Sequence, residues 1–301
     1  MVVTGASGLL GSMLTLRARE RFDVLALTRS RRLNPDGFQT QRLDLVAEDE
    51  VNRVLDDFRP ESLIHCAALT DVDRCENDPR EALRQNSEIP SRLALWCRRK
   101  EVRMVHLSTD AIFDGERGGY EEGDEARPVN EYGASKRAGE VRVLEANPAA
   151  LVVRTNLFGC GLDGPAALVG WILSQFKSGK DVPGWTDVRF NPLFTGTLAS
   201  VLLELTESER SGPLHLAARN SMSKFEFARI VGATWGYNPD RVRPTRSLDA
   251  LLRTRRPLDT TLAVDLAERM LGRRVPSVED EVGAMKGFVE DGAAALAYLA
   301  E

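Results

Sequence analysis

The first half of the chain alternates short apolar runs with segments in which apolar residues recur at helical spacing. The short runs predict buried strands at Val2–Thr4, Val24–Thr28, Leu63–Cys66, Met104–Ser108 and Leu151–Arg154. Between them, helical spacing connects Val51, Val54, Leu55 and Phe58, and again Leu93, Trp96 and Cys97. Strands that alternate with helices are typical of βαβ units, so the pattern predicts a parallel sheet.

A longer helix is predicted from about Asn130 to Asn147, because an asparagine caps a helix start well and the pattern stops before Pro148. After Phe158 glycine and proline become frequent. A strand-like run then follows at Pro213–Ala217, and further helical patterns lie at Phe225–Trp235 and from Pro276 onward.

These elements predict an α/β fold: a Rossmann, doubly wound parallel sheet with a smaller, discontinuous α/β lobe. We expect residues 1–158, with about 188–218, to form the Rossmann domain. Residues 159–187 and 219–301 are expected to form the lobe. Because open α/β sheets bind ligands at the carboxyl ends of their strands, the lobe would cover that edge.

A glycine-rich loop follows the first predicted strand and opens a helix. In TGASGLLG, Gly5 would turn the chain, Gly8 would let a pyrophosphate approach the backbone, and Gly11 would bring helix and sheet close together. The start of the helix offers free N–H groups to the phosphates. The loop predicts a dinucleotide site formed by Gly5, Ser7, Gly8, Leu9, Leu10 and Gly11.

The end of the second predicted strand carries arginines where an NAD-binding protein usually has an acid. Guanidinium groups at Arg29 and Arg31, with Ser30 between them, would bind a 2′-phosphate. This favours NADP(H), with NAD(H) as an alternative cofactor and an exposed basic loop as the plainer interpretation. Asp44 and Leu45 follow a third strand-like segment, where the carboxylate would reach the adenine amino group.

Candidate catalytic residues lie on and before the predicted helix. Tyr132 and Lys136 are four residues apart and therefore share one helix face. A phenol needs a lowered pKa to act as an acid–base group near neutral pH, and a neighbouring ammonium provides that shift. Thr109, at the end of the preceding strand, would hydrogen-bond the substrate oxygen.

The sequence resembles the extended short-chain dehydrogenase/reductase superfamily and, within it, the dTDP-4-dehydrorhamnose reductase branch. Similar segments cover nearly the whole chain, among them TGASGLLG, HCAALTDVDRCENDP, STDAIFDG and PVNEYGASKRAGE. The resemblance implies that Cys66, Ala67, Ala68 and Leu69 line the cofactor and that Asn86 supports the active site. It assigns Thr109, Tyr132 and Lys136 to catalysis. Substrate contacts are expected from Thr70, Thr109, Asp110, Asn156 and Arg189.

Two family aromatics are replaced in this chain. Ala111 stands where the family's STDYVFDG segment has tyrosine, and Asn156-Leu157 follows Arg154-Thr155 where the family has a tryptophan. Both aromatics shape the sugar site in the family. The resemblance is therefore stronger for the cofactor half than for the substrate half.

The expected activity is NADPH-dependent reduction of a keto group on a nucleotide-linked deoxysugar. Tyr132 would protonate the developing alkoxide, Lys136 would lower the pKa of that phenol and hold the nicotinamide ribose, and Thr109 would position the carbonyl oxygen. No metal is expected. Two alternatives remain: an NADP-binding regulatory subunit resembling that of methionine adenosyltransferase, and a sugar-nucleotide epimerase or dehydratase.

Composition limits the partners. The formal net charge of −5 gives no general attraction to nucleic acid or to anionic membranes. There is no apolar run long enough for a membrane span and no signal-peptide pattern, so we expect a cytoplasmic protein with reduced cysteines. The expected partner is a small-molecule nucleotide sugar, and a homodimer is a further option.

Overall fold

The computed structural model describes residues 1–249 and 254–300. Its centre is a seven-stranded sheet in which every neighbouring pair is parallel. The strand order is β3 (Gln39–Arg42), β2 (Leu25–Thr28), β1 (Val2–Thr4), β4 (Ser62–His65), β5 (Arg103–Thr109), β6 (Leu151–Thr155) and β13 (Gly212–Leu216). The order reverses between β1 and β4, which is where doubly wound sheets bind their ligands. The predicted Rossmann fold is confirmed.

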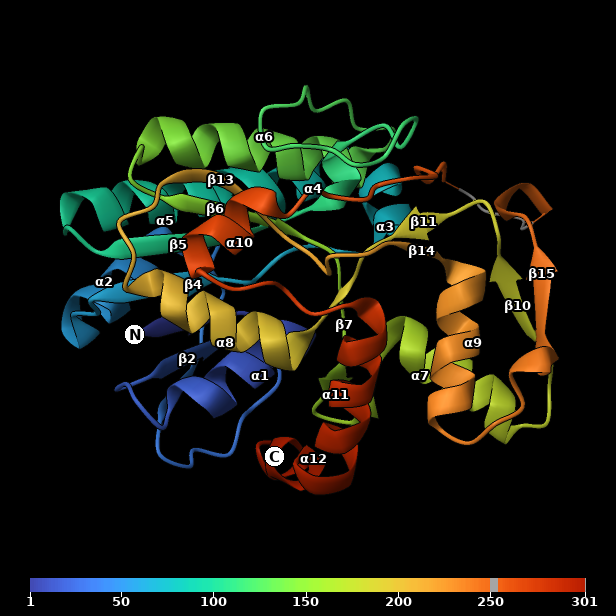
Figure 1. The fold of residues 1–301 in the computed structure, drawn as a ribbon. Helices are drawn as coiled ribbons and strands as arrows, with labels where there is room; N and C mark the ends of the chain where they lie inside the picture. The colour runs from blue at the N-terminus through green and yellow to red at the C-terminus, as the bar shows by residue number, and fades with distance from the viewer. Residues whose placement is uncertain (250–253, 301) are drawn as a thin grey trace.

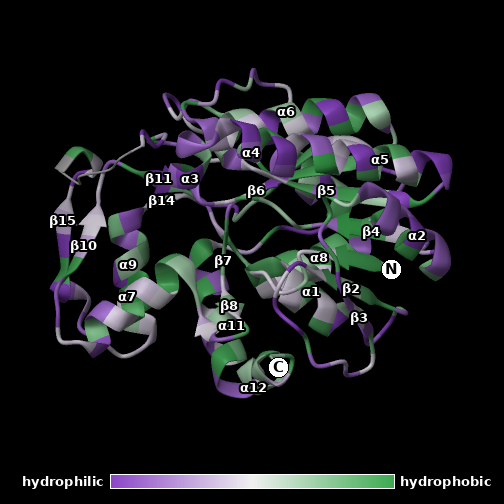
Figure 2. Ribbon diagram, turned by 180° about the vertical axis from the view of Figure 1, so that it is seen from behind, coloured by the Kyte–Doolittle hydropathy of each residue, from purple (hydrophilic) through white to green (hydrophobic). Residues whose placement is uncertain are grey.

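Neighbouring residues of a strand point to opposite sides of the sheet, and here both sides carry apolar side chains. Helices therefore cover both faces. Val3 and Ile64 pack with α1 (Leu9–Ala18) and α8 (Thr195–Thr206) on one face. Val2 and Leu63 pack with α2 (Glu48–Phe58), α5 (Ile89–Arg99) and α6 (Glu131–Ala146) on the other. Figure 1 shows the two helix layers, and Figure 2 shows the hydrophobic strands enclosed between them.

A group of short elements extends beyond the carboxyl ends of the strands. It contains α7 (Ala167–Lys177), α9 (Lys224–Thr234) and a two-stranded parallel sheet of β10 (Val182–Trp185) and β15 (Val242–Thr245). These elements lie to one side of the main sheet in Figure 1. The exact boundary between the Rossmann domain and the lobe stays a prediction.

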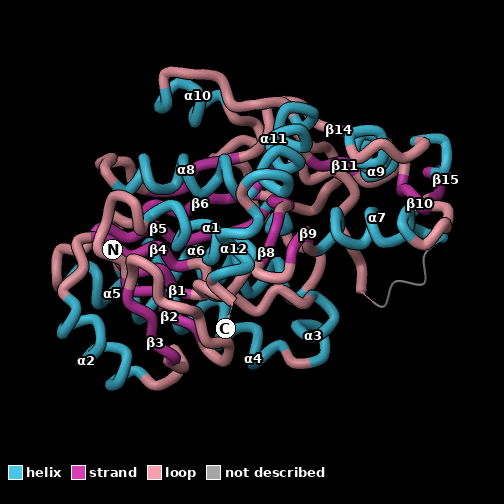
Figure 3. The backbone as a smooth tube through the Cα atoms, turned by 90° about the horizontal axis from the view of Figure 1, so that it is seen from below, coloured by secondary structure: helices cyan, strands magenta, loops and turns pink. Residues whose placement is uncertain are grey.

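The C-terminal helices return to the Rossmann layers. Helix α10 (Asp265–Leu271) contacts β13, and α11 (Val278–Asp291) contacts both β12 (Leu193–Phe194) and α9. Helix α12 (Ala293–Tyr298) contacts α1, and Figure 3 shows it beside that helix. The C-terminal part of the chain therefore joins the outlying elements to the sheet.

The remaining elements are short. They are α3 (Val72–Asn77), α4 (Pro79–Leu83), the π-helical turn η1 (Arg84–Glu88), η2 (Asp110–Ile112), β7 (Leu157–Phe158), β8 (Cys160–Gly161), β9 (Gly164–Pro165), β11 (Arg189–Phe190), β14 (Met222–Ser223), η3 (Pro239–Arg241) and η4 (Ser247–Asp249). Among the described residues, no helix has the length and apolar character needed to cross a membrane.

The predicted helix at 130–147 is confirmed as α6. The Asn130 side chain accepts a hydrogen bond from the Gly133 N–H at 2.9 Å, so it caps the helix as expected. The cap fixes where the helix begins and therefore the direction in which Tyr132, in its first turn, points.

Candidate functional site

The glycine loop forms a tight cradle between β1 and α1. Gly5 has a φ of +67°, and a Cβ there would lie 2.8 Å from the backbone of Ala67. A Cβ at Gly11 would lie 2.2 Å from the Gly5 carbonyl oxygen, so only glycine allows this approach of helix and strand. Exposed Gly8 leaves the backbone open at the start of α1. This geometry fits a pyrophosphate at a helix N-terminus.

The loop after β4 forms the opposite wall of this cradle. Cys66 and Ala67 lie against Gly5, and Ala68 is exposed. Asn86 holds the loop: its amide donates to the Leu69 carbonyl at 3.0 Å, and its oxygen accepts from the Leu69 N–H at 2.8 Å. Asn86 lies in the π-helical turn η1, a kind of irregularity that is frequent at functional sites.

Asn86 also reaches the candidate catalytic helix. Its amide donates to the Ser135 hydroxyl on α6 at 3.0 Å. A Cβ at Gly139 would lie 2.1 Å from the Asn86 carbonyl oxygen, which shows how closely α6 approaches η1. One buried amide thus connects the cradle, the loop after β4 and α6.

The two predicted arginines at the end of β2 differ in their partners. Arg31 forms a bidentate ion pair with Asp163 at 2.7 and 2.9 Å. Within the described part of the chain, no hydrogen bond or ion pair engages the exposed guanidinium of Arg29. Ser30 is exposed beside it. Arg29 is therefore the better placed of the two to bind an added phosphate.

Asp44 and Leu45 lie beyond the end of β3. The Asp44 carboxylate is exposed and accepts a hydrogen bond from the Val46 N–H at 3.0 Å. That bond orders the turn and leaves the second carboxylate oxygen accessible. Leu45 is partly buried against the helix face that covers β1 and β2.

Thr109 ends β5 and Asp110 begins η2, and both residues are buried. The Thr109 hydroxyl donates to Asp110 at 3.1 Å and accepts from the Ala111 N–H at 3.1 Å. Asp110 also accepts from the amide of Asn156 at 2.8 Å and from the hydroxyl of Thr260. Burial raises the pKa of Asp110, and these hydrogen bonds oppose the shift.

Tyr132 lies in the first turn of α6, next to Thr109. A Cβ at Gly133 would lie 2.3 Å from the Ala111 carbonyl oxygen, so this turn packs directly on the residues after β5. The ring of Tyr132 contacts the cluster of Leu69 and Cys75. Burial raises the pKa of Tyr132 to about 12, while the nearby Thr109 hydroxyl opposes the shift.

Lys136 lies one turn further along α6 and points at the ends of β4 and β5. Its ammonium donates to the Leu107 carbonyl at 2.6 Å. Burial lowers the pKa of Lys136 to about 8, and the charge of Glu140 opposes the shift. Burial also lowers the pKa of His65 to about 3, and the charge of Lys136 adds to this effect. The imidazole is therefore neutral.

The three histidines are buried. His65 and His106 stack with ring centroids 5.4 Å apart, and His65 Nδ1 lies 2.7 Å from the Thr4 hydroxyl. His215 lies beside Arg154, with 3.3 Å between the guanidinium and Nε2. Among the described residues, no cluster of three or more His, Cys, Asp or Glu could hold a metal ion.

A buried ion pair connects α6 to strand β6. Glu140 and Arg154 have side chains only 1% and 4% exposed, and they form two hydrogen bonds of 3.0 and 2.9 Å. Ser108 donates to the same carboxylate at 2.6 Å. Arg154 also donates to the carbonyl of Glu122, so the acidic loop at 121–125 is fastened to this pair.

The remaining predicted substrate residues lie on different sides of the site. Thr70 is exposed at the end of the loop after β4, and Asn156 is fixed by Asp110. The Arg189 guanidinium donates to the carbonyl and hydroxyl oxygens of Ser221 at 3.3 and 3.2 Å, and it lies 3.9 Å from Glu226. Arg189 thus belongs to the outlying elements, where its guanidinium already has hydrogen-bond partners.

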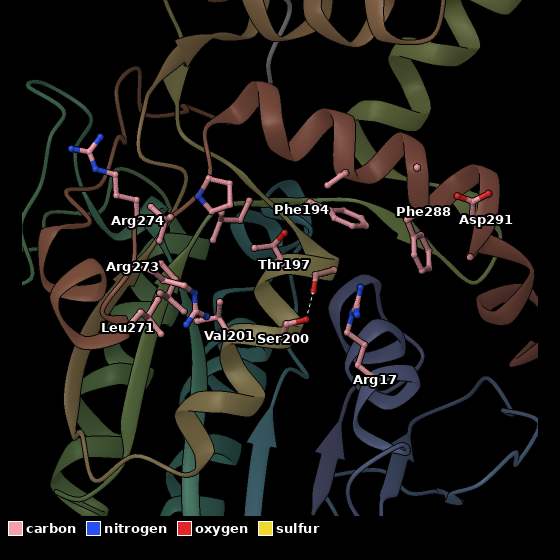
Figure 4. A pocket seen from close by; sticks show the side chains of 18 residues that line it. Arg17, Phe194, Thr197, Ser200, Val201, Leu271, Arg273, Arg274, Phe288 and Asp291 are labelled. Carbon is pink, nitrogen blue, oxygen red and sulfur yellow. Dashed lines mark hydrogen bonds between the residues drawn. The ribbon is translucent and has the colours of Figure 1, made fainter.

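Among the cavities that lie outside the group of predicted residues, two adjoin elements from the second half of the chain. One, of about 670 Å³, lies between α1, α8 and α11, with Arg17, Phe194 and Phe288 in its lining (Figure 4). It contains none of the predicted site residues. The other, of about 460 Å³, lies between α7, α9 and the β10–β15 sheet. Its lining includes Lys224, whose charge acts on Asp110.

The sequence alone did not predict contacts between residues that lie far apart along the chain. Glu140 and Arg154 lie within segments that resemble family motifs, but only the fold shows their contact. Thr260 reaches Asp110 from 150 positions further along the chain. Lys224 lies at the start of α9, where the sequence indicated only an apolar helix.

Parallel strands, a glycine cradle at the switch point and a tyrosine–lysine pair on the adjacent helix define an NAD(P)-dependent reductase of the extended short-chain dehydrogenase type. The profile of the family described as RmlD substrate binding domain matches residues 1–287. The chain belongs to this family.

Individual relatives agree with this assignment. A probable low-salt glycan biosynthesis reductase, Agl14 of Haloferax volcanii, is 33% identical over 96% of this chain and 98% of its own. A dTDP-4-dehydrorhamnose reductase of Mycobacterium tuberculosis is 35% identical over 93% and 98%. A dTDP-4-dehydrorhamnose reductase of Bacillus anthracis, solved in complex with NADP, superposes with a TM-score of 0.81 and is 26% identical over 95% and 97%.

Proposed function

We propose that this protein uses NADPH to reduce a keto group on a nucleotide-linked deoxysugar. The observation that carries the proposal is the position of Tyr132. The first turn of α6, which carries the phenol, packs on the residues that follow Thr109 at the end of β5, and Asn86 connects this helix to the loop that packs on the glycine cradle. The names of the reductases from Mycobacterium tuberculosis and Haloferax volcanii support the same class of substrate.

Each side chain has a distinct task in this reaction. Bound NADPH supplies the hydride. When substrate binds, the Thr109 hydroxyl would turn its one proton from Asp110 to the substrate carbonyl oxygen, and Tyr132 gives that oxygen its proton as negative charge develops on it. Lys136, whose ammonium donates to the Leu107 carbonyl, would hold the nicotinamide ribose.

Asp110 acts as a support for Thr109. Hydrogen bonds from Asn156 and Thr260 hold its carboxylate, which in turn accepts from the Thr109 hydroxyl. Asn156 and Ala111 stand where the family has bulkier aromatic residues, and both are hydrogen-bonded to the Thr109–Asp110 pair. We infer that the sugar differs from the rhamnose precursor in its substituents.

The proposal is tested by NADPH oxidation against a panel of dTDP- and UDP-linked 4-keto-6-deoxysugars. We expect consumption of one NADPH per ketone reduced with at least one member. Cofactor-bound protein that interconverts the sugars with no net NADPH consumption would indicate an epimerase or dehydratase instead. Protein that binds NADP and changes none of them would indicate a regulatory subunit.

Replacing Arg29 tests the cofactor preference. We expect Arg29→Ala to weaken NADPH binding by about tenfold to hundredfold and to leave NADH binding unchanged, because a charge-assisted hydrogen bond to the 2′-phosphate is lost. Titration of the reduced-nicotinamide fluorescence measures both affinities. Arg53→Ala, an exposed arginine on α2, is the matched control. Equal losses for both cofactors would contradict the role of Arg29.

A further inference from the structure

A hairpin of two short strands lies beside the glycine cradle. Strands β8 and β9 pair antiparallel, with Gly161 opposite Gly164, so Leu162 and Asp163 form a two-residue turn between them. Leu162 is buried in the core cluster to which α1 also contributes, whereas the Asp163 side chain is 81% exposed. A Cβ at Gly161 would lie 3.8 Å from the side chain of Leu9, at the start of α1. The hairpin is therefore fixed against α1 and presents a carboxylate to solvent.

Helix α12 positions both this hairpin and the loop that follows β2. It contacts β9, and Figure 3 shows it beside the two strands of the hairpin. In the loop after β2, the Asn34 N–H donates to the carbonyl of Leu299, the residue directly after α12, at 2.9 Å. The Asn34 side-chain amide donates to the Tyr298 carbonyl at 3.3 Å. The C-terminal helix thus holds two segments that lie far apart along the chain.

Arg31 and Asp163 connect these two segments. Two guanidinium nitrogens of Arg31 donate to the two carboxylate oxygens at 2.7 and 2.9 Å, which is the bidentate geometry that arginine forms with carboxylates. The hydrogen bond from Arg31 lowers the pKa of Asp163, so the carboxylate is ionised at neutral pH. A Rossmann domain holds the adenosine ribose of its cofactor between the glycine loop and the end of β2. The ion pair therefore lies at the edge of the space expected for that ribose.

Asp163 and a 2′-phosphate would compete for one guanidinium. NADP(H) differs from NAD(H) by this single phosphate on the adenosine ribose. To bind the phosphate through two parallel hydrogen bonds, Arg31 has to release the carboxylate, and the two anions repel each other while both are close to it. NAD(H) carries a hydroxyl at that position and requires no such exchange. The ion pair therefore opposes the binding of NADP(H) selectively.

We propose that Asp163 determines the cofactor preference, because it holds Arg31 in an ion pair that NADP(H) has to break and NAD(H) leaves intact. The inference rests on the proposed function for the use of a nicotinamide cofactor at the cradle. It deepens that function by placing a specificity-determining residue on the hairpin, outside the loop after β2 where this preference is usually set. Asp163 acts through Arg31, whereas Arg29 binds the phosphate without such an exchange.

The test is titration of cofactor-free protein with NADPH and with NADH, followed by the fluorescence of the reduced nicotinamide. We expect Asp163→Asn to bind NADPH about threefold to tenfold more tightly, because it removes a competing surface ion pair and a negative charge beside the phosphate. The affinity for NADH should stay within about twofold of wild type. Because exposed charges are screened, the gain for NADPH should decrease at about 1 M salt.

Arg31→Met shows whether Asp163 acts through Arg31. In that background the competition no longer exists, so adding Asp163→Asn should change the affinity for NADPH by less than about twofold. Asp36→Asn is the matched control. Asp36 lies between β2 and β3 and pairs with Arg19 at the end of α1, so this variant also neutralises one exposed carboxylate but leaves Arg31 as it is. It should bind both cofactors as wild type does, and unfolding curves establish that each variant is folded.

Three results would overturn the inference: an affinity for NADPH that stays the same or falls in Asp163→Asn, an equal gain for NADPH and NADH, or a gain of the same size in the Arg31→Met background. These titrations require no ketosugar. If they give the predicted preference and no nucleotide ketosugar oxidises NADPH, the role of Asp163 stands and the proposed function fails. If a ketosugar is reduced and Asp163→Asn binds both cofactors as wild type does, the inference fails alone.

Discussion

Replacing Tyr132 with phenylalanine is expected to lower kcat for ketosugar reduction by about 10²- to 10⁴-fold, the usual contribution of a positioned acid–base group. The change removes one oxygen atom and leaves the ring against Leu69 and Cys75. Thr109 and the glycine cradle are untouched, so the affinity for NADPH should stay the same. Stopped-flow measurement of NADPH oxidation gives the rate, and nicotinamide fluorescence gives the affinity.

Tyr298→Phe is the matched control for this change. Tyr298 lies in α12 and is 59% exposed, so the same loss of a hydroxyl there should alter neither the rate nor the affinity. A Tyr132→Phe variant that reduces the ketosugar at the wild-type rate would rule out the phenol as the proton donor.

The second large effect concerns stability. Glu140→Ala is expected to lower the free energy of unfolding by about 3–5 kcal/mol, because it leaves the buried guanidinium of Arg154 without its carboxylate. Ser108 and Arg137 lose the same partner. Urea unfolding measured by circular dichroism tests this. Glu145→Ala, an exposed glutamate on the same helix, should change the free energy of unfolding by less than about 0.5 kcal/mol.

A double variant tests whether the loss of stability comes from the unpaired charge that Glu140→Ala leaves on Arg154. Replacing Glu140 and Arg154 together by leucine and methionine removes both charges, so we expect it to recover much of the stability that Glu140→Ala loses. If Glu140→Ala unfolds like wild type, the pair does not support α6 in the way described here.

Local signals in the sequence were sufficient for six of the seven strands of the sheet and for α6. Asn130 marks the helix start and Pro148 follows its end, while apolar runs mark the central strands, whose ends differ from expectation by one residue at most. Strand β3 is different: its residues Gln39–Arg42 are polar and largely accessible at the sheet edge, so it is not marked by an apolar run and was expected only as a strand-like segment before Asp44. Edge strands need fewer apolar residues because one side has no neighbour.

Motif spacing identified Tyr132 and Lys136 because they are neighbours on a single helix. It gave no information on Asp110–Thr260 or Glu140–Arg154, since these contacts depend on how separate elements pack. The direction of Lys136 likewise depends on packing: its ammonium donates to Leu107. That Lys136 lowers the pKa of Tyr132 stays a prediction, since burial raises the pKa of Tyr132 to about 12 in this structure.

The most direct test of the central claim is transfer of deuterium from nicotinamide C4 of labelled NADPH to the sugar. We predict that the reduced sugar nucleotide carries the label on its new carbinol carbon, and that Tyr132→Phe slows the appearance of labelled product by at least about 10². A product without the label, or labelled product formed equally fast by the variant, would contradict a reductase in which Tyr132 donates the proton.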